Sequence, residues 1–137
     1  MIMPMSTVVA GTPYYVLMDV NRRIGPKVLH LHSGSECPPI YGFSNRGSYE
    51  KFCMNSQLAL KPYPLVKRYL REQSVALGDG LKLVVVDASG PCEPCLNAAT
   101  MEAVLEAQEN RTTHMTTVYR LLFDQEANAY RVAEVSV

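Results

Sequence analysis

The stretch LKLVVVD, residues Leu81 to Asp87, decides the fold that we expect for this 137-residue chain. In a strand, successive side chains point to opposite faces, and here both sets are apolar apart from Lys82 and the final Asp87. A strand of this composition is one that neighbouring elements cover on both sides. The sequence therefore predicts that Leu81–Asp87 is a central strand of a layered domain.

The segments before this strand carry further strand patterns. Period-two apolar spacing predicts a first strand at Pro13–Val20 and a second at Lys27–His32. Turn residues at 21–26 join the two as a hairpin. A short third strand is expected at Ile40–Phe43.

Helix patterns occupy most of the remaining chain. Three helices are expected: one capped by Ser48 and running to about Leu60, one from Leu65 to Leu77 with Pro64 near its first position, and one that Asn97 or Thr100 caps and that runs to about Asn110. The glycines of GDG, residues 78–80, end the second helix.

The end of the chain has the pattern of another hairpin. TTVYRLLF (116–123) and AYRVAEVSV (129–137) flank five loop residues, and a change of phase predicts a β-bulge near Ala133 and Glu134. The fold class is therefore α+β, with one mixed, mostly antiparallel sheet and about three helices packed mainly on one face. Residues 1–12 are expected to be a flexible N-terminal arm, and residues 13–137 a single α+β domain.

Composition excludes several classes of partner. Thirteen basic and thirteen acidic residues cancel, so we expect no binding to nucleic acid and none to an anionic membrane. No apolar run approaches the roughly 20 residues of a membrane span. The N-terminus has no basic start, and Pro4 and Ser6 interrupt its apolar part, so it does not resemble a signal peptide. We therefore expect a cytoplasmic protein with reduced cysteines.

The loop after the central strand contains Cys92 and Cys95 in a C-x-x-C motif. A helix N-terminus beside such a pair favours the thiolate, and GPCEPC is similar to the active-site string of thioredoxin. Three features argue against a redox role. If Asn97 caps the helix, Cys92 lies a turn before its start, and Pro91 stands where the thioredoxin string has an aromatic residue. A thioredoxin-type fold also needs a proline-led strand facing the two thiols, and the strands after residue 111 contain no proline. A loop shaped by Pro91 and Pro94 is the interpretation that we favour, with the redox pair kept as a hypothesis.

A metal site is a weaker hypothesis. One C-x-x-C supplies two ligands, whereas tetrahedral zinc takes four. His30, His32, Cys37 and His114 complete a set only if distant segments converge. We therefore expect neither a metal nor another cofactor, and Cys53 falls on the inward stripe of its helix as an apolar filler.

Two strings suggest a family. PIYGFSNRGSYEKFC, Pro39 to Cys53, resembles the SseB-like (enhanced serine sensitivity) proteins, in which a short strand ends in an aromatic and a hydroxyl residue and leads directly into a helix. LKLVVVDASGPCEPCLNAATMEAVL, Leu81 to Leu105, resembles the later strand, loop and helix of that family. The likeness covers roughly residues 13–110. It implies a compact α/β domain without a known catalytic centre, of a kind associated with bacterial stress, secretion and accessory genes.

The first functional hypothesis is a non-enzymatic binding or interaction domain of a small bacterial or mobile-element protein. Five aromatic residues of the first third form either a recognition surface or part of the core: Tyr14, Tyr15, Tyr41, Phe43 and Tyr49. The partner is expected to be a protein or a second copy, with a homodimer as one form, because TVYRLLF (117–123) is a candidate edge strand. The interface candidates are Tyr41, Phe43, Tyr119 and Leu121.

Two alternatives remain. The chain is a small thiol-disulfide oxidoreductase that uses Cys92 and Cys95, or it binds a small ligand at the carboxyl end of the central strand. Open α/β sheets bind ligands at that end of their strands. The ligand-binding candidates there are Asp87, Ser89, Gly90 and Asn97.

Overall fold

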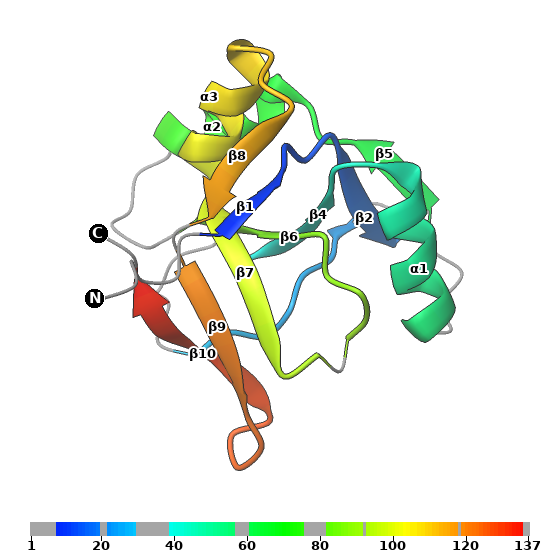
Figure 1. Ribbon diagram of the computed structural model, residues 1–137, viewed down its shortest axis with the longest axis vertical. Coiled ribbons are helices and arrows are strands. Elements are labelled where there is room, and N and C mark those ends of the chain that lie inside the picture. Colours follow the sequence, from blue (N-terminus) through cyan, green and yellow to red (C-terminus); the bar gives the residue numbers. More distant parts are fainter. Residues whose placement is uncertain are drawn as a thin grey trace, which may run out of the picture.

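The structure is a computed structural model that describes residues 8–19, 22–29, 39–56, 61–75, 82–91, 93–117 and 119–135. Within these residues the chain is an α+β fold, as expected (Figure 1). The helices are α1 (Arg46–Ser56), α2 (Lys67–Val75) and α3 (Met101–Glu109). The strands are β1 (Val8–Gly11), β2 (Tyr15–Asp19), β3 (Arg22–Arg23), β4 (Ile40–Phe43), β5 (Lys61–Pro64), β6 (Leu83–Val86), β7 (Cys95–Thr100), β8 (His114–Thr117), β9 (Tyr119–Asp124) and β10 (Ala129–Val135).

The main sheet is mixed and mostly antiparallel. Its order is β10-β9-β7-β6-β4-β2-β3, with β5 paired to the other side of β2, while β1 and β8 form a separate two-stranded ribbon. β6 lies inside the sheet, parallel to β4 and antiparallel to β7. All four of its residues are buried. The prediction of a central strand is therefore confirmed.

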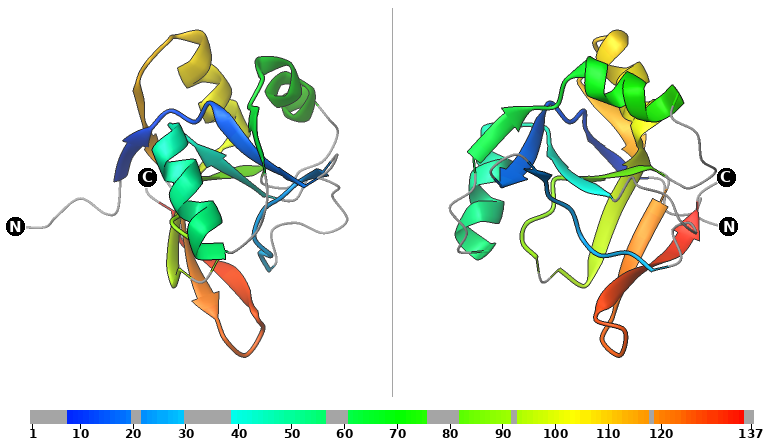
Figure 2. Two further views of the ribbon diagram at one scale, coloured as in Figure 1. Left: turned by 90° about the vertical axis from the view of Figure 1, so that its right-hand side faces the viewer. Right: turned by 180° about the vertical axis from the view of Figure 1, so that it is seen from behind.

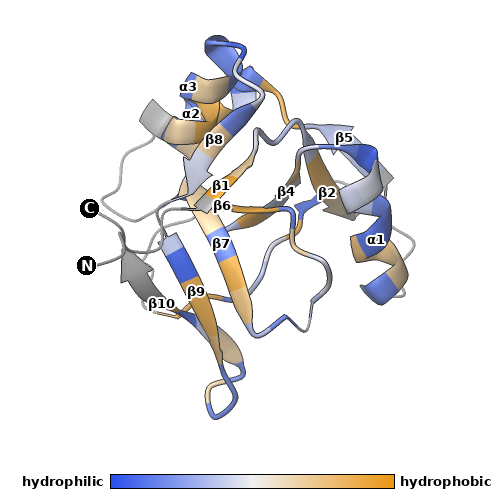
Figure 3. Ribbon diagram, in the orientation of Figure 1, coloured by the Kyte–Doolittle hydropathy of each residue, from blue (hydrophilic) through white to orange (hydrophobic). Residues whose placement is uncertain are grey.

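Helices cover both faces of this sheet. Leu83 and Val85 of β6 pack in one core cluster with Phe52 of α1, whereas Val84 packs on the opposite face with Val104 of α3. Figures 1 and 2 show α2 and α3 side by side at one end of the molecule, with α1 apart from them. Two of the three helices therefore share a face. Figure 3 shows the apolar residues concentrated on the inner strands and the hydrophilic ones on the hairpin tip and outer helical turns.

The terminal hairpin forms as predicted. β9 and β10 pair from Ala129–Asp124 to Val135–Tyr119, and their register shifts between Val132 and Glu134, which confirms the expected bulge. β9 is nevertheless not an edge strand, because it also pairs with β7 through Leu96 and Leu121. The expectation of a free edge along TVYRLLF is wrong for that reason.

The first hairpin does not form as predicted. Its second strand was expected at Lys27–His32, but β2 pairs instead with β3, whose two residues lie inside the predicted turn 21–26 and face Met18 and Asp19. Of the expected second strand, Val28 makes only an isolated parallel bridge to Tyr130. The remainder of that strand, His30 to His32, lies outside the described residues.

Helix α1 starts earlier than its predicted cap. The Oδ1 atom of Asn45 accepts a hydrogen bond from the backbone N–H of Ser48 at 2.8 Å, so Asn45 is the capping residue. For α3, the Oγ1 atom of Thr100 accepts from the N–H of Ala103 at 3.0 Å. Of the two caps proposed for that helix, Thr100 is therefore correct and Asn97 is not.

Besides β3, three further strands were not expected. β5 contains Pro64, which therefore belongs to a strand and not to the first turn of α2. β7 occupies Cys95–Thr100, where the start of a helix was one of the predictions. β1 pairs with β8, and Thr12 is buried, its N–H donating to the carbonyl of Thr113 at 3.1 Å. Residues 8–12 are therefore part of the folded domain and not of an arm.

The helices that the structure describes have nine to eleven residues. In this part of the chain, none is long and apolar enough to cross a membrane.

Candidate functional site

Asp87 and Ser44 form a polar pair at the carboxyl ends of the parallel strands β6 and β4. The Oδ1 atom of Asp87 accepts from the backbone N–H of Ser44 at 2.8 Å, and its Oδ2 atom accepts from the Ser44 hydroxyl at 2.7 Å. The backbone N–H of Asp87 donates to the carbonyl of Gly42, also at 2.8 Å. Both carboxylate oxygens and the backbone amide thus fix the end of β6 to the end of β4.

The backbone at Asp87 is strained. Its φ is 53°, in the left-handed region that residues other than glycine rarely adopt. Such a conformation costs on the order of 1–3 kcal/mol and persists only where surrounding contacts enforce it. The two bonds from Ser44 are contacts of that kind, so the pair both requires and stabilises the sharp turn after β6.

The surroundings of the pair come from two other elements. The Nδ2 atom of Asn45 donates to the Ser44 hydroxyl at 3.2 Å, which links the pair to the cap of α1. On the other side, a Cβ atom on Gly11 would lie 2.5 Å from the Cβ of Ser44, so only glycine fits there. His114 pairs with Gly11 in the β1–β8 ribbon, but its side chain is exposed and its Nδ1 atom contacts the hydroxyl of Thr113.

The loop that follows Asp87 is held by hydrogen bonds of its own. The Nδ2 atom of Asn55 in α1 donates to the carbonyl of Ser89 at 2.6 Å, and the N–H of Ser89 donates to the Glu93 carboxylate. The Tyr130 hydroxyl donates to the Glu93 carbonyl. Gly90 is buried against Asn55. Ser89 and Gly90 therefore anchor the loop on α1 at the same end of the sheet as Asp87.

Asn97 does not join this group. It lies in β7 opposite Arg120 of β9, and no hydrogen bond of the described residues links it to Asp87. Sequence reasoning placed it on a helix beside the loop, whereas it belongs to a strand. Ser44 and Asn45 were missed, although a Ser-Asn pair directly before a helix is a signal for a cap.

The cysteines are only partly described. Cys95 is a free, half-buried thiol at the start of β7, and Cys92 lies outside the described residues. Because α3 begins six residues after Cys95, at Met101, its N-terminus does not lie next to this thiol in sequence. Cys95 therefore does not lie at the start of a helix, which is the position that the redox hypothesis assumed. In α1, burial raises the pKa of Tyr49, and the neighbouring Cys53 thiol adds to this shift.

The interface candidates need correction. Tyr41, Phe43 and Leu121 are buried in the core, and the partly buried Tyr119 packs against the same cluster. The rings of Tyr41 and Phe43 contact the ring of Phe52 in α1 in tilted and edge-to-face arrangements, with centroids 4.6 and 5.6 Å from it. They face inward because they lie on the face of β4 that α1 covers. These side chains are therefore not available to a partner at the surface.

A different set of large side chains is exposed at the junction between β5 and α2. Tyr14 is 40% exposed, Tyr63 is 43% exposed and Val66 is 42% exposed. Tyr63 pairs with Val16 of β2, and the N–H of Leu65 donates to the carbonyl of Tyr14 at 2.8 Å. The register therefore places the two tyrosines diagonally across the β2–β5 ladder, on one face. We call Tyr14, Tyr63 and Val66 the tyrosine surface.

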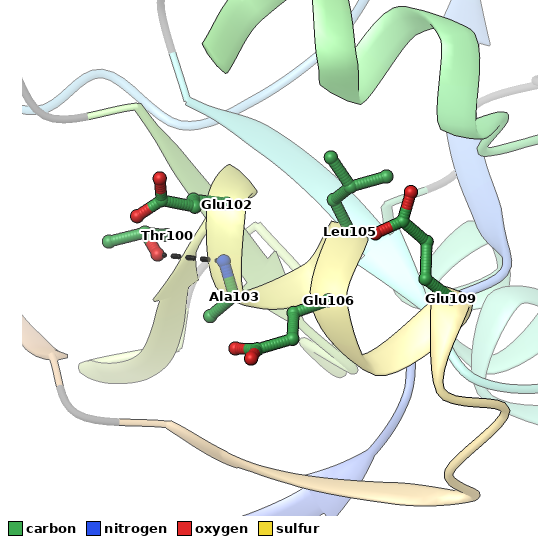
Figure 4. A pocket seen from close by; sticks show the side chains of 6 residues that line it. All are labelled: Thr100, Glu102, Ala103, Leu105, Glu106 and Glu109. Atoms are coloured by element: carbon green, nitrogen blue, oxygen red, sulfur yellow. Dashed lines mark hydrogen bonds between the residues drawn. The ribbon is translucent and has the colours of Figure 1, made fainter.

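A shallow depression of about 460 Å³ lies elsewhere, along the outer side of α3 (Figure 4). Its lining is Thr100, Glu102, Ala103, Leu105, Glu106 and Glu109. Figure 4 shows the three carboxylates spread along the helix and pointing in different directions. Within the described ranges, no three His, Cys, Asp or Glu side chains are grouped to hold a metal ion. His30, His32 and Cys37, the other ligands of the zinc hypothesis, fall outside those ranges.

Comparisons with protein families, with curated proteins and with solved structures found no match to this chain.

Proposed function

We propose that this chain is a non-enzymatic interaction domain that binds a protein partner through the tyrosine surface. The observation that carries the proposal is the exposure of Tyr14, Tyr63 and Val66 at one junction of the fold. Of the other aromatics of the first third, Tyr41, Phe43 and Tyr49 are core residues, and the partly buried Tyr15 packs against them. An interaction surface in this region therefore depends on the residues that the core leaves outside.

Tyrosine suits recognition because its ring offers a large apolar area and its hydroxyl remains compatible with water. An aromatic side chain buries about 150–250 Å², so covering the exposed part of one such ring removes about 80 Å² from water. At about 25 cal/mol per Å², this contributes about 2 kcal/mol per ring to binding. Two rings can therefore dominate the affinity of a small interface.

The hydrogen bonding of the Asp87–Ser44 pair also supports a non-enzymatic role. Both carboxylate oxygens accept from Ser44, and the Ser44 hydroxyl donates to Asp87 and accepts from Asn45. A nucleophile needs its hydroxyl beside a base that can accept the proton and release it. Here the hydroxyl instead holds a strained turn. The pair therefore has a structural role. This agrees with the resemblance to SseB-like proteins, which implies a domain without a known catalytic centre.

The test is a selection from a random peptide library displayed on phage, against the purified chain. We expect enriched peptides to bind the Tyr14→Ala/Tyr63→Ala variant at least about tenfold more weakly than the wild type. Met54→Ala is the matched control, because Met54 is exposed on α1, which packs on the opposite face of the sheet from Val16, the residue that Tyr63 pairs with. Enriched peptides that bind the double variant as tightly as the wild type would overturn the proposal.

The strain at Asp87 supports a second candidate function, the binding of a small polar ligand at the ends of β4 and β6. Such strain clusters at binding sites as well as in tight turns. A ligand hydroxyl would have to replace that of Ser44 on the carboxylate. A fragment screen by NMR tests this directly: hits that shift the Ser44 and Asp87 amides, and that Asp87→Asn abolishes, are the expected result. Hits confined to other surfaces would exclude the site.

A further inference from the structure

Among the described residues, strand β5 pairs only with β2, so it is an edge strand there, and its two prolines occupy particular positions. In its pairing with β2, Tyr63 lies opposite Val16, and the N–H of Leu65 donates to the carbonyl of Tyr14. Backbone groups of an antiparallel strand point alternately toward and away from the partner strand. Tyr63 and Leu65 therefore direct their N–H groups toward β2, and the positions of Pro62 and Pro64 face outward.

The outer edge of β5 consequently lacks hydrogen-bond donors over this stretch. Proline has no N–H, so Pro62 and Pro64 offer only their carbonyl groups on the free side. A strand added to a sheet edge needs both donors and acceptors in alternation. A partner of the tyrosine surface is therefore hindered from joining the sheet as an extra strand, and it must be held mainly by side chains.

Positive charge lies next to Val66 of the same surface. Helix α2 contains Lys67, Arg68 and Arg71 against a single acid, Glu72, although the whole chain has no net charge. Arg68 pairs with Glu72 at 3.4 Å, and Arg71 pairs with Glu109 of α3 at 3.2 Å. After these two acids are counted against the three bases, one positive charge remains on the helical turn that follows Val66.

From this charge and this edge we infer that the partner of the tyrosine surface is an acidic protein segment that docks through its side chains. The inference rests on the proposed function and adds the chemistry of the partner. Apolar side chains of the segment cover Tyr14 and Tyr63, and its carboxylates lie near the exposed Lys67 and Arg68. Electrostatic complementarity of this kind gives selectivity and faster association more than affinity.

A single-stranded nucleic acid is the competing occupant of a surface with basic and aromatic residues. It fits less well, because Val66 has no ring on which a base can stack and the chain as a whole carries no net positive charge. The experiment therefore includes an oligothymidine as a probe. Oligothymidine that binds more tightly than an acidic peptide would overturn the inference.

The experiment measures fluorescence anisotropy with three short labelled peptides that share the same leucines and prolines. Their remaining positions are aspartate and glutamate in the first, serine in the second and lysine in the third. We expect the acidic peptide to bind about tenfold more tightly than the serine peptide, and the lysine peptide to bind most weakly. Raising the salt from about 0.1 M to about 1 M, which shortens the Debye length to about 3 Å, should remove this preference.

Matched variants assign the effects to the residues. Lys67→Glu with Arg68→Glu should abolish the preference for the acidic peptide, whereas Lys51→Glu, at an exposed position of α1, should leave it unchanged. Tyr63→Ala should weaken all three peptides, with Met54→Ala as the control. An acidic peptide with N-methylated backbone amides cannot form a ladder, and it should retain its affinity within about threefold.

The outcomes separate the two proposals. If all three peptides bind equally and Tyr63→Ala weakens them, the acidic preference is refuted and the interaction surface stands. If Tyr63→Ala has no effect on any peptide that binds, or none binds, both proposals fail. Loss of binding on N-methylation would show that the segment adds a strand and would refute docking through side chains.

Discussion

Gln108 of α3 offers the sharpest test of how the tyrosine surface is supported. Its side chain is only 3% exposed. Its Nε2 atom donates to the carbonyl of Pro13 at 2.8 Å and to that of Leu65 at 3.0 Å. One amide group thus joins α3 to the residue before Tyr14 and to the residue before Val66. Replacing it by methionine preserves much of the volume and removes both donors.

The expected loss follows from the hydrogen bonds. Each neutral hydrogen bond contributes about 1 kcal/mol net, and a buried carbonyl left without a partner costs about 1–3 kcal/mol. The carbonyls of Pro13 and Leu65 gain no new donor in Gln108→Met, and methionine regains part of the loss through apolar packing. We expect a net destabilisation of about 2–4 kcal/mol. For a domain of this size, that lowers the melting temperature by roughly 6–12 °C.

The assay is urea unfolding followed by circular dichroism, with Gln125→Met as the control. Gln125 is exposed in the turn between β9 and β10, so the same chemical change there should alter the free energy of unfolding by less than about 0.5 kcal/mol. The m-value should stay constant, since the area exposed on unfolding is unchanged. A Gln108→Met variant that unfolds at the same urea concentration as the control would refute the role assigned to these two bonds.

Gln108→Glu adds a dependence on pH with a definite sign. A carboxylate facing two carbonyl oxygens is unfavourable, so the pKa of the new carboxyl should be raised above its unfolded value of about 4.3. A raised folded-state pKa means that stability is greatest below the unfolded pKa and falls as the pH rises through the folded pKa. The free energy of unfolding of Gln108→Glu should therefore fall further below that of Gln108→Met as the pH rises from about 4 to 7. A difference independent of pH would contradict the geometry.

Three further predictions concern other parts of the fold. Arg111 has a φ of 57° directly after the α3 cap, so Arg111→Gly should raise the free energy of unfolding by about 1 kcal/mol in the same urea assay; a loss of stability would refute the strain argument. The Arg131 guanidinium bonded to Asp124 lowers the pKa of that carboxyl, so its contribution to stability is present above the unfolded pKa of about 3.9 and is lost as the pH falls through the folded value. Thermal melts should show that Asp124→Asn has a lower melting temperature than the wild type at pH 7 and that this difference disappears below about pH 4. A difference in melting temperature that does not change with pH would contradict this. Pro62→Ala with Pro64→Ala restores outward N–H groups on β5, so light scattering should detect more self-association than for the wild type, and an unchanged mass would refute the account of this edge.

The inner strand and the last hairpin could be predicted because their patterns are local. β6 has apolar residues on both faces, and the phase change between Val132 and Glu134 marks the bulge in the sequence itself. β7 could not be predicted in this way. Its residues include Asn97, Ala98 and Ala99, which have low strand propensity. Pairing with β6 on one side and β9 on the other overrides that preference.

The candidate site was predictable only in part for a similar reason. Asp87 follows an obvious strand, so its place at the end of the sheet could be inferred. Its partner Ser44 is 43 residues away in sequence, and the two meet only because Gly42 lies beside Val86 in the parallel pair. Nothing in the sequence of either segment specifies that register. The same limit applies to Tyr14 and Tyr63, which become neighbours only through the unexpected strand β5.

Two strands at the margins of the main sheet, β5 and β10, also bear on where a partner can bind. At one edge, Pro62 and Pro64 remove the donors of β5. At the other edge, the N–H of Tyr130 in β10 donates to the carbonyl of Lys27, and its carbonyl accepts from the N–H of Leu29, both at 2.8 Å. The backbone at each of these positions is therefore blocked or already paired. Recognition at these places has to depend on side chains, which favours the exposed tyrosines over strand addition as the means of binding.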